Sequence, residues 1–375
     1  MALSKVDLAN QVENQLPQNL VANNLPFRNI IINGDMSIAQ RGTSATGITS
    51  TGFNTVDRYR TTLGTLGTWT ETQETDAPSG QGFVKSLKLD CTTADASPAA
   101  ADYLYIRYMI EAQNLQYLKY GTANAETLTL SFWVKSNKTG DGTISILQPD
   151  NSNKLFNPSY TINTADTWEK KTINIPADTS GLINNDNGTG IQIQWWLNSG
   201  SDYQGGSHLS SWGTYANSNL NTSNLAVGGS TSDYWQITGI QLEAGTTASD
   251  FEFLPHDVNL GRCQRYFYMH ANTNADEIGI GGYYSSSQIF CDFQFPVSMR
   301  TTPSVYITTG TNYFRIFRNG AIDSFNSLTF GAGNVNMFSL YNNTEVSGTA
   351  GHAGFVRPEN SSAVIGADAE LWLTQ

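Results

Sequence analysis

Short segments in which apolar and polar residues alternate recur through most of this chain and constrain its fold more than any other feature. In the segment 128–134 every second residue is apolar, and 191–197 repeats the pattern. Successive side chains of a β-strand point to opposite faces, so a period of two predicts strands. The spacers are rich in turn-forming Gly, Asn and Ser, and no long helical pattern separates the segments. The sequence therefore predicts an all-β protein of packed antiparallel sheets.

The chain is expected to hold two β domains behind a short leader. Its 375 residues exceed what one compact core usually organises. The alternating pattern stops near Gly245, and Pro255 restricts Leu254 to extended angles before the pattern resumes. Asp257 is expected to cap a short helical turn that runs through Cys263. We therefore predict a short N-terminal helix and linker, a larger β-sandwich and a second, smaller β-sandwich, over residues 1–25, 26–255 and 256–375.

Charge and composition exclude several classes of protein. The net charge is −12 with a pI near 4.7, and there is no basic stripe that could bind nucleic acid. No apolar run has the length of a membrane span, so we expect no membrane insertion. Cys91 and Cys291 lie in phase with apolar neighbours, which predicts buried thiols. The three cysteines show neither a disulfide framework nor the spacing of a zinc site.

Six motifs occur along the chain in a characteristic order. The junction between the predicted domains, residues 237–267 (ITGIQLEAGTTASDFEFLPHDVNLGRCQRYF), is the longest of them. The other five are IINGDMSIAQRG, an Asp-Arg-Tyr unit, LTLSFWVKSNKTG, FPVSMRTTPSV and DAEL, at residues 31–42, 57–59, 128–140, 295–305 and 368–371. Together these motifs resemble a family of tailed-bacteriophage virion proteins of the tail-fibre and receptor-binding type.

The resemblance implies a fold, a location and partners. In that family a jelly roll similar to carbohydrate-binding modules precedes a C-terminal β domain, so the resemblance implies the same order here. It implies a homotrimer in the virion that contacts host cell-surface glycan and binds other virion proteins, such as a tail adaptor or tube. A capsid decoration protein, either a head fibre or a cement protein bound to major capsid protein, is the first alternative. A host-polysaccharide-degrading enzyme is the second.

The N-terminal segment 4–16 carries a helical pattern. Leu8, Val12 and Leu16 recur at intervals of four and form one narrow apolar stripe. A helix of this length is marginal alone in water, so the stripe needs a partner. We expect either a frayed tail or a segment that attaches the chain to the virion.

A row of side chains on the predicted strand 191–197 is the first candidate for glycan binding. Its members share one face and combine three amides with an aromatic ring: Gln192, Gln194, Trp196 and Asn198. An aromatic ring stacks on the apolar face of a sugar while amides bind its hydroxyl groups. In the alternative interpretation a neighbouring subunit or the loop 201–219 covers Trp196.

The loop 201–219 supplies two more candidates. Trp212 and Tyr215 lie among Gly and Ser residues, a composition typical of binding loops. The resembling family has a similar loop with a Trp, which implies instead that Trp212 closes the end of the sandwich.

Jelly-roll carbohydrate modules, to which the first domain is similar, often hold a structural ion between their first and last strands. Here Asn33, Asp35 and Glu243 are the oxygen donors that could bind calcium. The alternative for Asn33 and Asp35 is a turn stabilised by their own side chains.

No catalytic motif stands out. A glycosidase needs two facing carboxylates, and the acidic residues are scattered through predicted loops. The four histidines lie far apart in sequence and form no triad or HExxH unit. We therefore expect a non-enzymatic protein with no catalytic residues and no cofactor.

Overall fold

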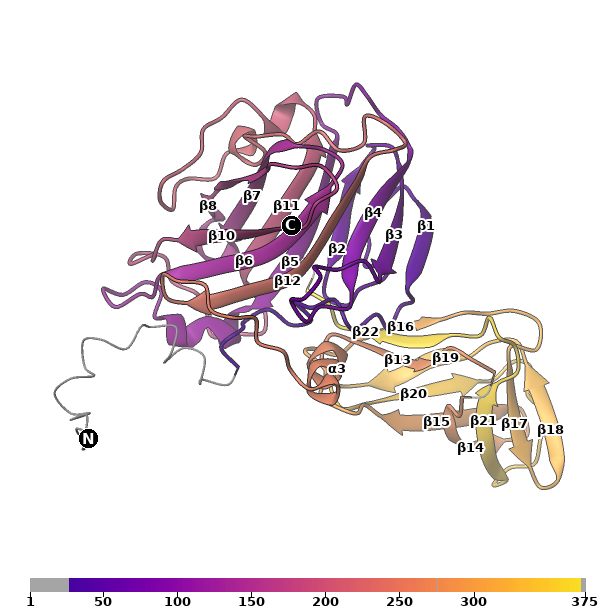
Figure 1. Ribbon diagram of the computed structural model, residues 1–375. Coiled ribbons are helices and arrows are strands. Elements are labelled where there is room, and N and C mark those ends of the chain that lie inside the picture. Colours follow the sequence, from indigo (N-terminus) through magenta and orange to yellow (C-terminus); the bar gives the residue numbers. More distant parts are fainter. Residues whose placement is uncertain (1–26, 275, 372–375) are drawn as a thin grey trace, which may run out of the picture. The chain divides into compact units, whose positions relative to one another are not determined.

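A computed structural model describes residues 27–274 and 276–371 (Figure 1). The chain divides into two compact units, the first ending at Leu254 and the second beginning at Pro255. The predicted helix over 4–16, with Leu8, Val12 and Leu16, lies outside the described residues. Within them, no helix is both long and apolar enough to cross a membrane.

The first unit is a jelly-roll sandwich of two antiparallel sheets, as predicted. One sheet has the order β1-β3-β4-β12-β6-β10: Ser44–Ile48, Thr68–Glu74, Ser86–Thr93, Tyr234–Ala244, Leu128–Ser136 and Glu169–Ile175. The other has the order β2-β5-β11-β7-β8, with β9 paired to β7: Arg60–Gly64, Tyr103–Glu111, Thr189–Ser199, Gly140–Gln148, Lys154–Phe156 and Ser159–Ile162. We call these the β12 sheet and the β11 sheet.

The core of the first unit lies between these two sheets. On β6, residues Leu128, Leu130, Phe132 and Val134 are all fully buried, as the period of two predicts. Three tryptophans with no exposed surface complete this core: Trp69, Trp195 and Trp235. Burial of such large side chains is a main source of the unit's stability.

Short helices lie in the connections. The 3-10 helices η1, η2, η3 and η4 cover Ala112–Leu118, Pro149–Asn151, Ser201–Tyr203 and Asn217–Asn219. The helix α3, His256–Gln264, follows the junction, where the sequence predicts a helical turn. The predicted cap is wrong, because Pro255 occupies the N-cap and Asp257 lies in the first turn. The carboxylate there still faces the positive end of the helix dipole.

The second unit is a smaller β-sandwich. A three-stranded sheet has the order β13-β22-β16: Phe267–Ala271, Ile365–Asp368 and Ser304–Ile307. A seven-stranded sheet has the order β18-β17-β21-β14-β15-β20-β19: Ala321–Phe325, Phe314–Arg318, Ala353–Pro358, Gly279–Ser285, Gln288–Gln294, Met337–Asn342 and Thr329–Gly333. One apolar core joins the two sheets.

Two sequence predictions about this unit have different outcomes. Cys291 is buried in its core, as Cys91 is in the first unit, and both thiols are free, as predicted. The alternating sequence AELWL at 369–373 predicts a closing strand, and this prediction is wrong for the described residues 369–371. There the Arg300 guanidinium donates hydrogen bonds to the carbonyls of Ala369 and Glu370, at 2.7 and 3.0 Å, so these carbonyls bind a side chain and no neighbouring strand.

The partly buried His270 on β13 predicts a pH dependence. Its ring stacks on Phe293 at 4.2 Å, and Nε2 lies 2.7 Å from the Ile278 carbonyl. Burial lowers the pKa of His270 below 6.5, although that carbonyl and Asp276 oppose the shift. A lowered histidine pKa means that the unfolded chain binds the proton more readily, so this stabilisation is complete above about pH 6.5 and is lost as the pH falls toward the folded-state pKa.

We therefore expect amide protection in β13 and β22 to fall on acidification from about pH 7.5 to about pH 5.5, after correction for intrinsic exchange rates. The variant His270→Phe keeps the ring stack and removes the titration, so its protection should stay constant across the same range. An equal loss of protection in this variant would contradict the assignment to His270.

Candidate functional site

The predicted row on β11 is not accessible to a ligand. Trp196 has 1% of its surface exposed, and Gln192, Gln194 and Asn198 are also buried. The Trp196 ring lies 4.5 Å from Tyr105 and 5.4 Å from Tyr203, which belongs to the segment that crosses over this face. The prediction of an open row is wrong, and coverage by the loop 201–219 is confirmed. The loop covers the row because its own apolar side chains bury area against Trp196.

The two loop candidates differ in accessibility. Trp212 packs against the core between Tyr120 and Phe156. Its indole N–H donates to the Pro176 carbonyl at 2.7 Å. Trp212 therefore closes the end of the sandwich. Tyr215 is 40% exposed, and its hydroxyl hydrogen-bonds to Asn217 at 2.7 Å.

The three proposed calcium ligands are bound to protein groups. Asn33 Oδ1 accepts the Ile38 N–H at 2.9 Å, and Asp35 accepts from the Ser37 hydroxyl at 3.1 Å. These bonds confirm the alternative of a stabilised turn for Asn33 and Asp35. Glu243 accepts from the backbone and hydroxyl of Ser249 at 2.9 and 2.6 Å and lies 3.7 Å from Arg28 Nε. Its carboxylate anchors the segment that follows β12.

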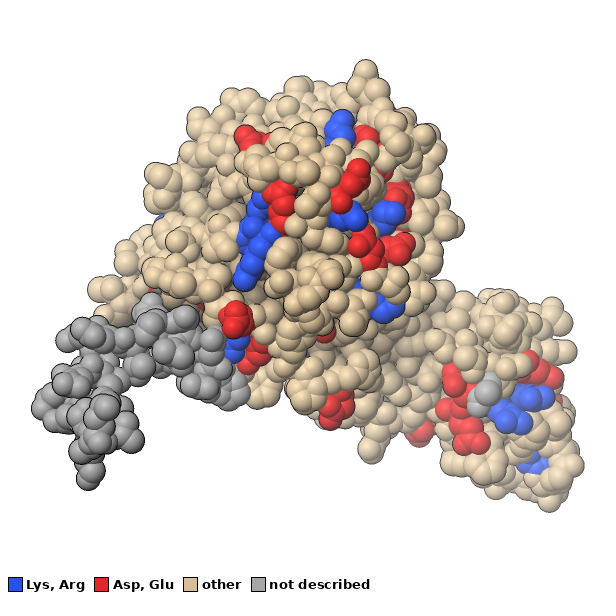
Figure 2. Space-filling model, in the orientation of Figure 1, with Lys and Arg blue, Asp and Glu red and all other residues tan. Residues whose placement is uncertain are grey.

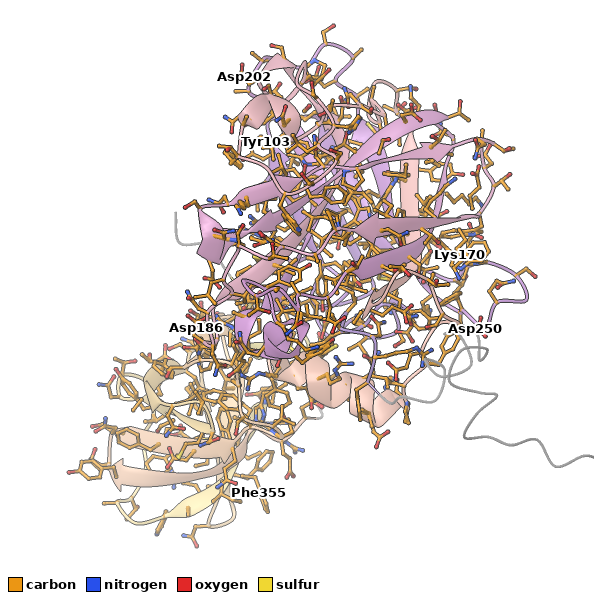
Figure 3. The ribbon with its side chains drawn as sticks, turned by 90° about the vertical axis from the view of Figure 1, so that its left-hand side faces the viewer. Tyr103, Lys170, Asp186, Asp202, Asp250 and Phe355 are labelled. Carbon is orange, nitrogen blue, oxygen red and sulfur yellow. The ribbon has the colours of Figure 1, made fainter. Side chains whose placement is uncertain are left out.

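The segment that follows β12 forms one wall of a pocket of about 200 Å³ on the outer face of the β12 sheet. Strands β6, β10 and β12 form its floor, and two segments distant in sequence form its walls. The lining residues are Gly80, Gln81, Phe83, Ser131, Trp133, Lys170, Gly239, Asp250, Phe251 and Phe253. Figure 3 shows Lys170 and Asp250 on the same side of the first unit, with Tyr103 and Asp202 on the opposite side.

Aromatic rings define one side of this pocket. Phe83, Phe251 and Phe253 form a cluster in which every pair of ring centroids is 4.8 to 5.1 Å apart. Trp133 is partly exposed beside them. Phe253 is 47% exposed, so the cluster presents apolar surface to the solvent. Partly exposed rings of this kind are what a sugar stacks on.

The polar groups of the pocket are available to a ligand. Within the described part of the chain, the ammonium group of Lys170, the carboxylate of Asp250 and the amide of Gln81 have no ion pair or side-chain hydrogen bond. The indole N–H of Trp133 likewise has no acceptor there. A few unengaged donors and acceptors beside apolar rings are the usual composition of a small-molecule site.

On the outer face of the β12 sheet beside the pocket, charged side chains are paired with other groups of the protein. Asp76 accepts from Lys135 at 2.8 Å and from the Trp168 indole at 3.2 Å. Burial alone would raise the pKa of Asp76, but these bonds outweigh it and lower the pKa below its usual value. Figure 2 shows acidic and basic side chains intermixed on the first unit. Lys170 differs from Lys135 in that it has no partner of its own among the described residues.

Gly239 is required by the pocket. Its φ is +62°, and a Cβ there would lie 2.6 Å from Phe83 Cζ and 2.9 Å from Trp133 Cδ1. The ladder between β12 and β6 shifts register at this point, which indicates a bulge. A glycine in the bulge lets the two rings approach the strand.

We expect Gly239→Ala to lower the free energy of unfolding by about 1–3 kcal/mol, since it combines a left-handed backbone with a steric contact. It should also weaken ligand binding, because the two displaced rings belong to the pocket. Gly47→Ala is the matched control, with a φ of +68° and no atom within 4 Å of the added Cβ. Urea unfolding and glycan binding measure both effects, and unchanged binding in Gly239→Ala would argue against this pocket.

The alternation along 128–134 predicts that Ser131 and Trp133 lie on the outer face of β6, but no site was predicted there. The signal was present, because a tryptophan at an outward position of a strand leaves a large ring for a ligand or a covering segment. The walls of the pocket were harder to predict from the sequence. Phe251 and Phe253 alternate after the closing strand, but only the fold brings them to Phe83.

Comparison with known proteins gives distant structural similarities. No family model matches the chain. No curated protein matches it in sequence. The enzymatically active domain of tailspike protein 4 from bacteriophage CBA120 is similar with a TM-score of 0.32 and 13% identity, over 59% of this chain and 22% of that one. TmCBM61 in complex with β-1,4-galactotriose is similar with a TM-score of 0.29 and 10% identity, over 58% of this chain and 99% of the module.

The CBM22-1 xylan-binding domain of Paenibacillus barcinonensis Xyn10C gives a TM-score of 0.27 and 9% identity, over 56% of this chain and 93% of the domain. Values this low assign no ligand, activity or partner to this chain.

Proposed function

We propose that this chain is a non-enzymatic structural protein of a bacteriophage virion that binds host cell-surface glycan through the first unit. The observation that carries the binding proposal is the pocket on the β12 sheet, where rings and unengaged polar groups lie together. The virion assignment rests on the six sequence motifs and their order. Tail fibre or receptor-binding protein is the role we favour, with a homotrimer as the assembly.

The size of the pocket suggests how a glycan would bind. A volume of about 200 Å³ is below that of pockets enclosing drug-sized ligands. It suits one sugar unit, with the rest of the polysaccharide lying over the outer face of the sheet. Trp133 and the Phe83 cluster would stack on the ring, and Lys170, Gln81 and Asp250 would bind its hydroxyl groups. Many copies on one particle would multiply a weak single contact.

Binding of the full chain to an array of bacterial surface glycans tests the proposal. We expect retention on glycans from a susceptible host and none on unrelated plant polysaccharides. No binding to any host glycan would contradict the proposed function. A shortening of the polysaccharide during incubation would contradict the non-enzymatic part alone, and labelled protein at the capsid would favour the decoration role over the tail.

A further inference from the structure

The second unit carries an exposed apolar surface on the outer face of its seven-stranded sheet. We propose that this face packs against the corresponding face of a neighbouring copy of the chain within the proposed homotrimer. We call it the β14 face and define it by its large side chains: Ile280, Tyr284, Phe290, Phe317, Ile322, Tyr341 and Phe355. The proposal does not depend on glycan binding by the first unit.

Cross-strand pairing makes these side chains contiguous. Ile322 on β18 pairs with Phe317 on β17, Phe317 pairs with Phe355 on β21, and Phe355 pairs with Ile280 on β14. Paired residues have their side chains on the same face of a sheet. Ile322, Phe355 and Ile280 are 56%, 51% and 60% exposed. Phe355 is labelled in Figure 3.

A second aromatic group continues the surface. Phe290 pairs with Gly282 on one side and with Tyr341 on the other. Its ring lies 6.0 Å from Tyr284, which is 75% exposed, and 5.8 Å from Tyr341. The opposite face of the same strands is fully buried, for example at Ile316 and Val356. A sheet with apolar residues on both faces marks an interaction surface, because the exposed face gains free energy when it is covered.

The polar residues around the β14 face have the composition of a protein interface. Arg315 and Arg357 lie over the Phe317 ring, 4.8 and 4.4 Å from its centroid. Lys171 is the last lysine of the sequence, so every basic side chain in the second unit other than histidine is an arginine. Protein interfaces are enriched in aromatic residues, Met and Arg and are depleted of Lys.

The charges on the β14 face indicate a second copy as the partner. Arg315 is paired with Glu359 at 3.7 Å. Arg357 on β21 and Asp292 on β15 have no ion pair in the described part of the chain, although both point outward like Phe355 and Phe290. One face therefore carries an apolar centre, an unpaired cation and an unpaired anion on different strands. Two such faces complement each other, because Arg357 of one copy can pair with Asp292 of the other.

Light-scattering mass measurement of the full chain after size-exclusion chromatography tests the proposal. We expect the wild-type mass to be a multiple of 40.9 kDa. The double variant I280T/F355S should fall to the mass of one chain. Leu182→Ser is the matched control, because Leu182 is 64% exposed in the first unit, and it should keep the wild-type mass. Both substituted residues are exposed, so circular dichroism should remain that of the wild type.

Charge reversal gives the sharper result. Arg357→Asp and Asp292→Arg should each dissociate the assembly, and the combination R357D/D292R should restore it. A monomeric wild-type chain would overturn the proposal, as would an assembly that survives I280T/F355S. Failure of the double reversal to restore the assembly would overturn the pairing of these two residues. A different virion protein that binds through Phe355 while the chain alone is monomeric would replace the second copy as the occupant.

Discussion

Replacement of Trp133 by Ala is expected to weaken glycan binding by roughly 5- to 150-fold, which corresponds to about 1–3 kcal/mol for one stacked ring by analogy with base–aromatic stacking. Trp133 is partly exposed in the floor of the pocket, and its indole N–H has no acceptor among the described residues. The substitution removes both the stacking surface and a free donor. Isothermal titration with a glycan that binds the wild-type chain measures the loss.

The control for this prediction lies on the opposite side of the first unit. Tyr215 is an exposed aromatic residue in the loop that covers the β11 sheet, and Tyr215→Ala should leave the affinity unchanged. The thermal unfolding midpoint of Trp133→Ala should stay close to that of the wild type, because the ring is partly solvated already. Wild-type affinity in Trp133→Ala together with a loss in Tyr215→Ala would move the glycan site to the β11 side.

The strands of the first unit that the sequence predicts, such as β6 and β11, place one face in the core. In β6 the alternation of the sequence is clear, and Leu128, Leu130, Phe132 and Val134 are fully buried in the core. Strands β14 and β19 of the second unit were not predicted, because their sequences lack this pattern. Their sequences, GIGGYYS and TFGAG, are rich in glycine and lack alternation. Strand β14 pairs with the adjacent β15 and with the distant β21, and β19 pairs with the adjacent β20. The glycine-rich local sequence does not report this pairing.

The candidate site was only partly predictable. Alternation correctly placed Trp196 and Trp133 on outer faces, but it could not show which outer face is covered. Coverage depends on where the loop 201–219 crosses, and that is decided by contacts of Tyr203 and Leu209 with the β11 sheet. The pocket itself needs residues from before β4 and after β12. Such a site is a property of the fold, and no local motif specifies it.

Replacement of Trp235 by Ala is expected to destabilise the first unit by about 3–5 kcal/mol, as for other large-to-small substitutions in a packed core. Trp235 on β12 has no exposed surface, and its indole N–H donates to the Tyr160 hydroxyl at 3.2 Å. The variant leaves a cavity between the sheets and a buried hydroxyl without its donor. Since domains are typically stable by only about 5–15 kcal/mol, the loss should be a large fraction of the total. Urea unfolding followed by far-UV circular dichroism measures it.

A comparison with Trp195 separates the contribution of packing to the stability from that of the hydrogen bond between Trp235 and Tyr160. It is equally buried on β11, but its indole N–H has no hydrogen-bond partner in the described residues. Both Trp195→Phe and Trp235→Phe reduce ring volume, and only the second removes a hydrogen bond. We expect Trp235→Phe to cost about 1 kcal/mol more than Trp195→Phe, the net value of a typical buried hydrogen bond. Equal losses in the two variants would show that packing alone determines the contribution of Trp235, and that its bond to Tyr160 adds nothing to the stability of the sandwich.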